Sequence, residues 1–344
     1  MSKTSNVMQM TPGEAVDAIV AAYHSKDPVF LLGEPGVGKS AVTKQAAERL
    51  GIDIIDLRLV QLEAVDLRGL PYKTEIEHGG NTHTVMSFAA TSILPRDGNG
   101  ILFLDEFAQA PTMVQNAASE LLLDRTCGEY RLPDGWLIVC ASNRRTDRAG
   151  TTEIPTHIRN RCCFIEVGVS QKEWLHWASG NGVSPHVIAY IKANPKQLQE
   201  FSADATAFPS PRSWVFVSNI LKGPAKGKIR EGMIHGCIGE GAGTELTVFL
   251  ERTLELPTYE DVIADPANVP IPSKSNLSFN LIGMVAHTAV PKDVDAVLTF
   301  LARFPPEETK FAMTMMAEEK PEFGKLAKFN SFFKELSGKE QVPA

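Results

Sequence analysis

One stretch decides the fold of this chain, and it reads Val29-Phe-Leu-Leu-Gly33-Glu-Pro-Gly-Val-Gly38-Lys39-Ser40. An apolar run is followed by Gly-x-x-x-x-Gly-Lys-Ser and then by a helix-like segment through Leu50. Backbone N–H groups in such a loop point inward and surround the oxygens of a di- or triphosphate. The flanking strand and helix patterns are those the motif requires, so the sequence predicts a nucleotide-binding site rather than a simple glycine-rich turn.

The loop assigns separate roles to its residues. Lys39 is expected to reach the outer phosphates, and the hydroxyl of Ser40 is expected to hold Mg²⁺. The predicted cofactors are therefore ATP and Mg²⁺, while the preference for ATP over GTP stays open. The residues predicted to contact the nucleotide are Gly33, Glu34, Pro35, Gly36, Val37, Gly38, Lys39, Ser40 and Ala41.

The bulk composition is that of an ordinary globular protein. Of the 344 residues, 43% are hydrophobic and 22% are charged, and the net charge of −7 argues against a dedicated nucleic-acid binder, which would carry a basic stripe. Five cysteines with no Cys-x-x-Cys pair suit a reducing compartment, and we interpret the adjacent Cys162 and Cys163 as small buried hydrophobic residues. With neither a membrane-spanning stretch nor a signal-peptide pattern, the expected location is the cytoplasm, away from any membrane.

Short apolar runs separated by helical patterns predict an α/β fold. We expect a phosphate-loop αβα core with a five-stranded, mostly parallel sheet covered by helices on both faces. A helix is predicted from Thr11, whose side chain forms a capping box with Glu14. The five predicted strands are Val29–Leu32, Ile52–Val60, Ile101–Leu104, Trp136–Ala141 and Cys162–Val167.

The pattern changes to helices and loops beyond this core. We predict a nucleotide-binding core over residues 1–168, a small helical lid over residues 169–245 and a mostly helical C-terminal extension over residues 246–344. The extension ends in an amphipathic helix over Pro321–Leu336, whose phenylalanines are expected to pack in the interior.

A second motif supplies the acidic groups. Ile101-Leu-Phe-Leu-Asp105-Glu106 is four apolar residues followed by two carboxylates, which suits a buried strand that ends beside the phosphate loop. Asp105 is expected to hold the Mg²⁺ shell together with Ser40, and Glu106 to polarise the water that attacks the γ-phosphate.

With both motifs in place, the chain resembles the AAA+ ATPases, and among them the MoxR-like, dynein-related branch. The resemblance rests further on Asp66-Leu-Arg-Gly69-Leu-Pro71, on Val139-Cys-Ala-Ser-Asn143, on Ile158-Arg159-Asn-Arg161 and on Ser210-Pro-Arg212-Ser-Trp214. It covers about residues 11–220 and fades in the last hundred residues.

The resemblance implies roles for four more residues. Asn143 matches the sensor-1 residue that orients the attacking water, and Arg212 matches the sensor-2 arginine of the lid. Arg159 and Arg161 match the arginine-finger position that acts on the neighbouring subunit's nucleotide, with Arg161 favoured and Arg159 as a second contact. An arginine finger requires a subunit interface, so the resemblance implies a homo-oligomeric ring, a hexamer by analogy with the family.

Two segments read as hairpins inserted into the core. Pro71–Pro95 contains two strand patterns around Gly79-Gly80, and Arg125–Pro133 contains a shorter arrangement around Gly128. Related AAA+ proteins carry hairpins at these places, and those hairpins face the pore of the ring. The two hairpins of this chain are therefore expected to be either pore elements that contact substrate or purely structural hairpins.

The implied function is that of a chaperone-like ATPase that remodels a protein client or loads a cofactor, with a partner carrying a von Willebrand A-type domain. One alternative is a nucleic-acid-translocating motor ring, against which the acidic balance and the lack of a basic cluster in the first hairpin argue. Another is a nucleotide-gated scaffold whose assembly is its output.

Overall fold

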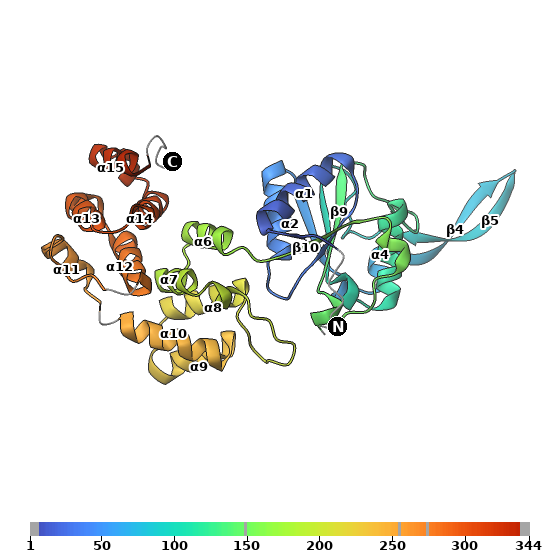
Figure 1. Ribbon diagram of the computed structural model, residues 1–344. Coiled ribbons are helices and arrows are strands. Elements are labelled where there is room, and N and C mark those ends of the chain that lie inside the picture. Colours follow the sequence, from blue (N-terminus) through green and yellow to red (C-terminus); the bar gives the residue numbers. More distant parts are fainter. Residues whose placement is uncertain (1–6, 148–149, 254–255, 273–274, 338–344) are drawn as a thin grey trace. The chain divides into compact units, whose positions relative to one another are not determined.

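The computed structural model describes residues 7–147, 150–253, 256–272 and 275–337, which form two compact units. The first unit extends to Val169 and the second begins at Ser170 (Figure 1). The predicted division of the second unit at residue 245 stays a prediction, and the predicted domain ends at residues 1 and 344 lie outside the described residues.

The first unit is built on a parallel sheet of six strands in the order β1-β10-β2-β9-β6-β3. The predicted α/β core is confirmed, but the expected number of five strands is wrong. The additional strand is β1, whose two residues are too few to produce a periodic pattern and which pairs only at the edge, beside β10. The strands are β1 Gln9–Met10, β2 Val29–Leu32, β3 Asp53–Arg58, β6 Gly100–Asp105, β9 Trp136–Ser142 and β10 Cys163–Val167.

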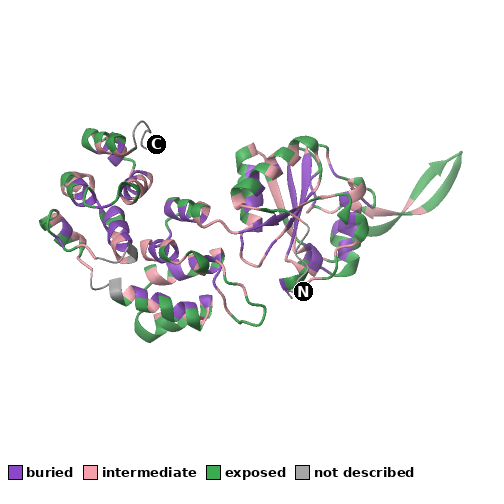
Figure 2. Cartoon of the chain, viewed as in Figure 1, coloured by how far each residue is buried: buried purple, intermediate pink, exposed green. Residues whose placement is uncertain are grey.

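Helices cover both faces of this sheet. Alternate residues along each strand point to opposite sides, and since both sets are apolar, both faces must be buried. Val29 and Leu31 of β2 pack with residues of α1 and α2, whereas Phe30 between them packs with residues of α4. The central strands are therefore buried except for the last residues of β2 and β6, which are partly exposed (Figure 2). The helices of the first unit are α1 Pro12–Ser25, α2 Lys39–Leu50, α3 Ala64–Arg68, α4 Thr112–Asp124 and α5 Thr156–Arg159, and short 3₁₀ turns are η1 Leu59–Gln61, η2 Phe107–Gln109 and η3 Arg145–Asp147.

The first helix begins as the sequence predicts. The Thr11 side chain accepts a hydrogen bond from the backbone N–H of Glu14 at 3.3 Å, and the Glu14 carboxylate accepts one from the backbone N–H of Thr11 at 2.8 Å. This reciprocal pair confirms the capping box and satisfies two helix-end donors.

Both predicted hairpins are present. Strands β4 (Leu70–His78) and β5 (Asn81–Ala89) pair antiparallel over nine residues and project from the core (Figure 1). Gly79 and Gly80, with φ of 61° and 78°, form the two-residue turn, a conformation that glycine adopts without strain. The second hairpin is short, with strands β7 (Thr126–Cys127) and β8 (Tyr130–Arg131).

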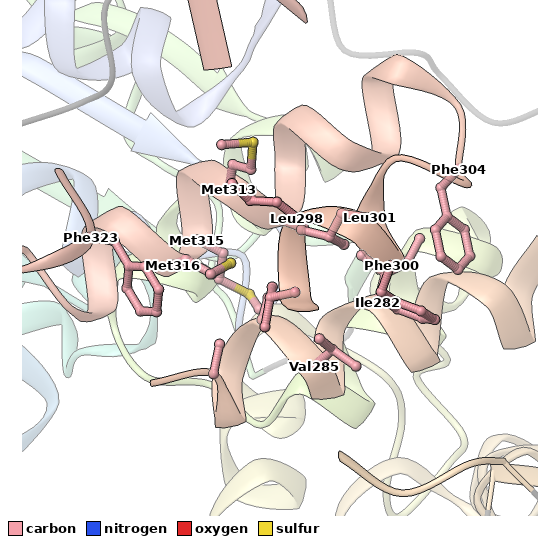
Figure 3. Close-up of a cluster of buried hydrophobic side chains, with 14 of the residues drawn as sticks. Ile282, Val285, Leu298, Phe300, Leu301, Phe304, Met313, Met315, Met316 and Phe323 are labelled. Carbon is pink, nitrogen blue, oxygen red and sulfur yellow. The ribbon is translucent and has the colours of Figure 1, made fainter. Parts of the chain in front are cut away.

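The second unit is helical. Its interior includes a cluster of aliphatic, methionine and phenylalanine side chains contributed by α11 to α15 (Figure 3). Within this unit α7 packs against α12. The helices are α6 Gln171–Gly180, α7 Pro185–Ala193, α8 Pro211–Lys222, α9 Gly227–Ile238, α10 Glu240–Thr253, α11 Tyr259–Ala264, α12 Ser275–Thr288, α13 Val294–Leu301, α14 Pro306–Glu319 and α15 Ala327–Ser337, and the 3₁₀ turns are η4 Pro195–Leu198, η5 Pro291–Asp293 and η6 Phe323–Lys325.

Two local expectations need correction. The amphipathic segment over Pro321–Leu336 is not one helix but the turn η6 followed by α15, although its residues Phe323, Phe329 and Phe333 are buried as expected. Cys162 is half-buried and Cys163 is exposed, since Cys163 only begins β10. In the part of the chain that the structure describes, no helix has the length and apolarity needed to cross a bilayer.

Candidate nucleotide site

The phosphate loop lies between β2 and α2. Gly36 and Gly38 both adopt positive φ, at 80° and 106°, which only glycine tolerates without strain. A side chain at Gly33 is excluded for a different reason, since its Cβ would lie 2.8 Å from the carbonyl oxygen of Val167 at the end of β10. The loop thus needs its glycines both for backbone conformation and for close approach to the neighbouring strand.

Helix α2 begins directly at the loop. Its N-cap, Gly38, provides no side-chain cap, so the first-turn N–H groups and the positive end of the helix dipole face the loop. A phosphate group suits this position, because helix N-termini at glycine-rich loops bind anions. The predicted contact residues Gly33 to Ala41 are all in this loop and in the first turn of α2.

Lys39 joins the loop to the end of β9. Its buried ammonium donates hydrogen bonds to the carbonyl oxygens of Gly33 and Glu34, at 2.8 and 3.1 Å. It also donates to the Oδ1 atom of Asn143 at 2.9 Å. The lysine and the predicted sensor-1 residue, 104 positions apart in the sequence, therefore meet at one point.

Ser40 and Asp105 also meet. The Ser40 hydroxyl donates to Oδ2 of Asp105 at 3.0 Å, with Asp105 at the end of β6. A hydroxyl and a carboxylate are the oxygen ligands that Mg²⁺ takes beside phosphates, so the pair fits this ion. Among the described residues no cluster of three or more histidine, cysteine or acidic side chains could hold a metal.

Glu106 has an unusual backbone conformation. Its φ of 57° and ψ of 36° are left-handed, and its N–H donates to Oδ1 of Asp105 at 2.8 Å. The other described non-glycine residues with positive φ, Lys26 and Arg125, end helices, where this conformation is common. Glu106 instead precedes the 3₁₀ turn η2, and away from a helix C-terminus a left-handed conformation costs on the order of 1–3 kcal/mol and is often found at functional sites. The partly exposed carboxyl group after Asp105 is thus where an attacking water could be bound.

The three predicted arginines lie on other elements of the chain than the phosphate loop and the ends of β6 and β9. Arg159, at the end of α5, donates to the Glu153 carboxylate at 2.7 Å and to the carbonyl oxygen of Ile154 at 2.9 Å. Arg161 is exposed between α5 and β10. Arg212 is exposed in the first turn of α8, in the other compact unit, so its contact with the phosphate loop stays a prediction.

The sequence analysis missed one residue of this region. Arg144 follows Asn143, and its guanidinium contacts the carboxylates of Glu34, Asp147 and Glu166. Burial lowers the pKa of Arg144, but hydrogen bonds with Asp147, Glu166 and Glu34 outweigh this effect and raise the pKa overall. The sequence signal was only an arginine next to a predicted sensor residue, without any spacing to indicate its partners.

Comparisons with known proteins agree with the geometry of the core. Residues 28–162 match the profile of the family described as "AAA domain (dynein-related subfamily)". The chain is 27% identical to "Midasin" of Giardia intestinalis over 192 residues, which cover 53% of this chain but only 4% of that protein.

Two solved structures are similar to this chain at low sequence identity. The structure of NtrX from Brucella abortus in complex with ATP is 12% identical, with a TM-score of 0.42, and the alignment covers 96% of this chain and 65% of that one. A putative ATPase from Cytophaga hutchinsonii is 14% identical, with a TM-score of 0.36 and coverage of 96% and 90%. With TM-scores this low, no conclusion about this chain is drawn from these two structures.

Proposed function

We propose that this chain is an AAA+ ATPase that hydrolyses ATP between the subunits of a ring in order to remodel a protein client or load a cofactor; its residues 28–162 match the dynein-related AAA domain. The observation that carries the proposal is the meeting of Lys39, Ser40, Asp105 and Asn143 at the carboxyl ends of neighbouring parallel strands. In open α/β sheets this edge is where ligands bind.

Each residue of the site has a chemical task in this proposal. Lys39 and the loop N–H groups bind the phosphates, and Glu106 accepts the proton of the attacking water. Asn143 orients that water through its amide. Mg²⁺, held by Ser40 and Asp105, would neutralise charge on the phosphate oxygens.

Turnover provides the first test. Glu106→Gln should keep ATP binding, because the loop is unchanged, and should lower the hydrolysis rate about 10²- to 10⁴-fold, the range for loss of a general base. Glu48→Gln, an exposed change on α2, is the control and should hydrolyse ATP like the unmodified protein. Unchanged hydrolysis in the Glu106 variant would remove this residue from the proposed role.

The ring is a separate step of the proposal. The exposed Arg161 is free to reach a neighbouring subunit, whereas Arg159 is engaged with Glu153 within its own chain. We therefore assign the arginine finger to Arg161, with Arg159 as a second contact, and expect a hexamer. Molecular mass in solution should be measured with ATP, with ADP and without nucleotide, and a monomer in all three conditions would overturn the ring.

The projecting β4–β5 hairpin supports a protein client. Residues that alternate along a strand share one face, and Leu70, Tyr72 and Ile76 on one face of β4 are 65%, 49% and 48% exposed. Exposed apolar side chains in a row are suited to bind another protein. Lys73 is outnumbered by the acidic residues Glu75 and Glu77 on this strand, which disfavours binding to a phosphate backbone.

A nucleic-acid motor would behave differently. Its ATPase activity would be stimulated by DNA, with an affinity that falls steeply with salt. We expect neither effect, and either one would favour that alternative over a protein client.

The partner and the location belong to the same proposal. We expect a cytoplasmic protein that binds a partner with a von Willebrand A-type domain. The Glu106→Gln variant, loaded with ATP, should retain client and partner on an affinity resin for identification by mass spectrometry. Recovery of ring subunits without any such domain would remove the partner from the proposal.

A further inference from the structure

Arg144 bonds three carboxylates that belong to three separate segments. Its Nη1 atom is 3.0 Å from Oε1 of Glu166 in β10, and its Nη2 atom is 2.9 Å from Oδ1 of Asp147 in η3. The same Nη2 atom contacts Oε1 of Glu34 in the phosphate loop. One guanidinium therefore ties together the loop after β2, the segment after β9 and the strand β10.

Asp147 bonds both the side chain and the backbone of Arg144. Its Oδ1 atom accepts from Nε at 3.0 Å, and its Oδ2 atom accepts from the backbone N–H of Arg144 at 2.9 Å. The side chain of Asp147 is 1% exposed and that of Glu166 is 10% exposed, and the arginine compensates part of the cost of burying both carboxylates. The planar fork of arginine suits several carboxylates at once, which a lysine ammonium does not.

The network includes two of the residues that Lys39 bonds, Glu34 and Asn143. On one side, the Glu34 side chain bonds Arg144 while the Glu34 carbonyl oxygen accepts from Lys39. On the other side, Arg144 is joined by its peptide bond to Asn143, whose Oδ1 atom accepts from the same ammonium. Glu34, Arg144, Asn143 and Lys39 are thus linked in a closed ring of contacts at the site.

The neighbouring arginine shows the contrast. The side chain of Arg145 is 76% exposed and lies 3.7 Å from the carboxylate of Glu153, whose side chain is 63% exposed. Such surface pairs contribute little and are screened by salt. The two adjacent arginines therefore differ in environment but not in chemistry, which makes Arg145 a matched control.

We propose that Arg144 is a positioning residue of the ATPase site, which holds Asn143 at a fixed distance from the phosphate loop by bonding Glu34, Asp147 and Glu166. This inference rests on the proposed roles of Lys39 and Asn143 in hydrolysis. Loosening the network moves the amide that orients water, while the loop that binds phosphate stays in place. Displacement of a reacting group by about 1 Å can lower a rate by ~100-fold.

The test separates kcat from KM. Arg144→Met should lower kcat for ATP by about 10- to 100-fold and change KM by less than about threefold, because water orientation is lost and phosphate binding is kept. Arg145→Met should leave both constants unchanged. Glu34→Gln should lower kcat in the same direction, and the double variant Glu34→Gln/Arg144→Met should lose no more than Arg144→Met alone, since the two groups act through one contact.

Two variants guard against a folding defect. Arg144→Met removes the cation that bonds these three carboxylates, so two further variants are measured in parallel, well below their unfolding temperatures. Arg144→Lys keeps the charge, and Glu34→Gln keeps the contacts to Asp147 and Glu166. If Arg144→Met does not fold, reduced kcat in these two variants supports the proposal. A kcat in both equal to that of Arg145→Met, or a rise in KM at constant kcat, would overturn it.

The outcomes also distinguish this inference from the proposed function. A chain that hydrolyses no ATP before any substitution contradicts the proposed function itself. An active chain whose Arg144 and Glu34 variants are unaffected contradicts only the positioning role.

Discussion

The two compact units use similar polar side chains in opposite ways. Around the phosphate loop, Ser40 and Lys39 bond partners 65 and 104 residues away. In the helical unit, Ser210 accepts from the backbone N–H of Ser213, three residues on, and Thr258 accepts from that of Asp261 in the same way. The same hydroxyl chemistry therefore assembles a site in one unit and starts a helix in the other.

The difference follows from the architecture. Parallel strands end at a common edge, so residues far apart in the sequence are brought together there. Helices leave unsatisfied N–H groups at their own first turn, so a nearby serine or threonine is used locally. Substitutions of the side chains that meet at the sheet edge should accordingly change chemistry, and substitutions of the helix caps should change stability.

The largest effect that tests this comparison is expected when Lys39 is substituted. Lys39→Ala should weaken ATP binding by about 100-fold or more, because charge-assisted bonds to phosphate are lost. Lys44→Ala on the same helix, where the exposed lysine faces Asp56 at 3.7 Å, should bind normally. Titration with a fluorescent ATP analogue and Mg²⁺ checks both variants, and equal affinities would contradict the assigned site.

The second unit should respond in stability instead. Phe300→Ala in α13 removes a fully buried ring and should lower the free energy of unfolding by about 3–5 kcal/mol. Phe216→Ala on the exposed side of α8 should change it by less than about 0.5 kcal/mol. Denaturant unfolding followed by circular dichroism gives both values, and similar losses at the two positions would argue against the packing described here.

A pair of serine substitutions makes the comparison directly. Ser40→Ala should lower turnover by ~10- to 100-fold, as loss of a metal ligand or its support does, with little change in stability. Ser210→Ala should leave nucleotide binding unchanged and lower the free energy of unfolding by about 1 kcal/mol, the usual value of an N-cap. An ATPase assay and thermal unfolding measure the two effects. A loss of stability in Ser40→Ala and a loss of turnover in Ser210→Ala would contradict the roles given to the two hydroxyls.

A pH-dependent effect on stability is expected at Lys192 in α7. Its ammonium lies 3.3 Å from the ring centroid of Phe279 and 4.6 Å from that of Phe311. Burial lowers its pKa from 10.5 to about 8, while Glu308 and Glu307 act in the opposite direction. Between these pH values the folded chain has released a proton that the unfolded chain keeps, so stability should rise as the pH increases through this window.

Lys192→Met should remove that rise. The free energy of unfolding, measured for both proteins from pH 7 to pH 10.5, gives the contribution of Lys192 as a difference, since the other titrating groups are shared. Parallel curves would contradict the described environment of the lysine.

The sequence predicted the phosphate loop and its flanking elements but less of the fold around them. Val29–Leu32 and Lys39–Leu50 have the observed bounds, because the loop motif requires a strand before it and a helix after it. The helices α9 and α10 were not predicted, since glycines at positions 232, 236, 241 and 243 lower helix propensity and suggest loops. Arg144 and its partner Glu34 are 110 residues apart, and nothing local in the sequence links them.

The attachment of the β4–β5 hairpin has a mechanical consequence. At Gly69, with φ of 84°, an added Cβ would lie 1.9 Å from the carbonyl oxygen of Ala89, so the two arms leave the core in close contact. Ser87 then bonds Glu129 of the second hairpin at 2.6 Å. Nine residues of strand extend about 30 Å, so a tilt of about 10° at this base would sweep the tip through about 5 Å. The hairpin can therefore act as a lever that enlarges small movements of the domain carrying it.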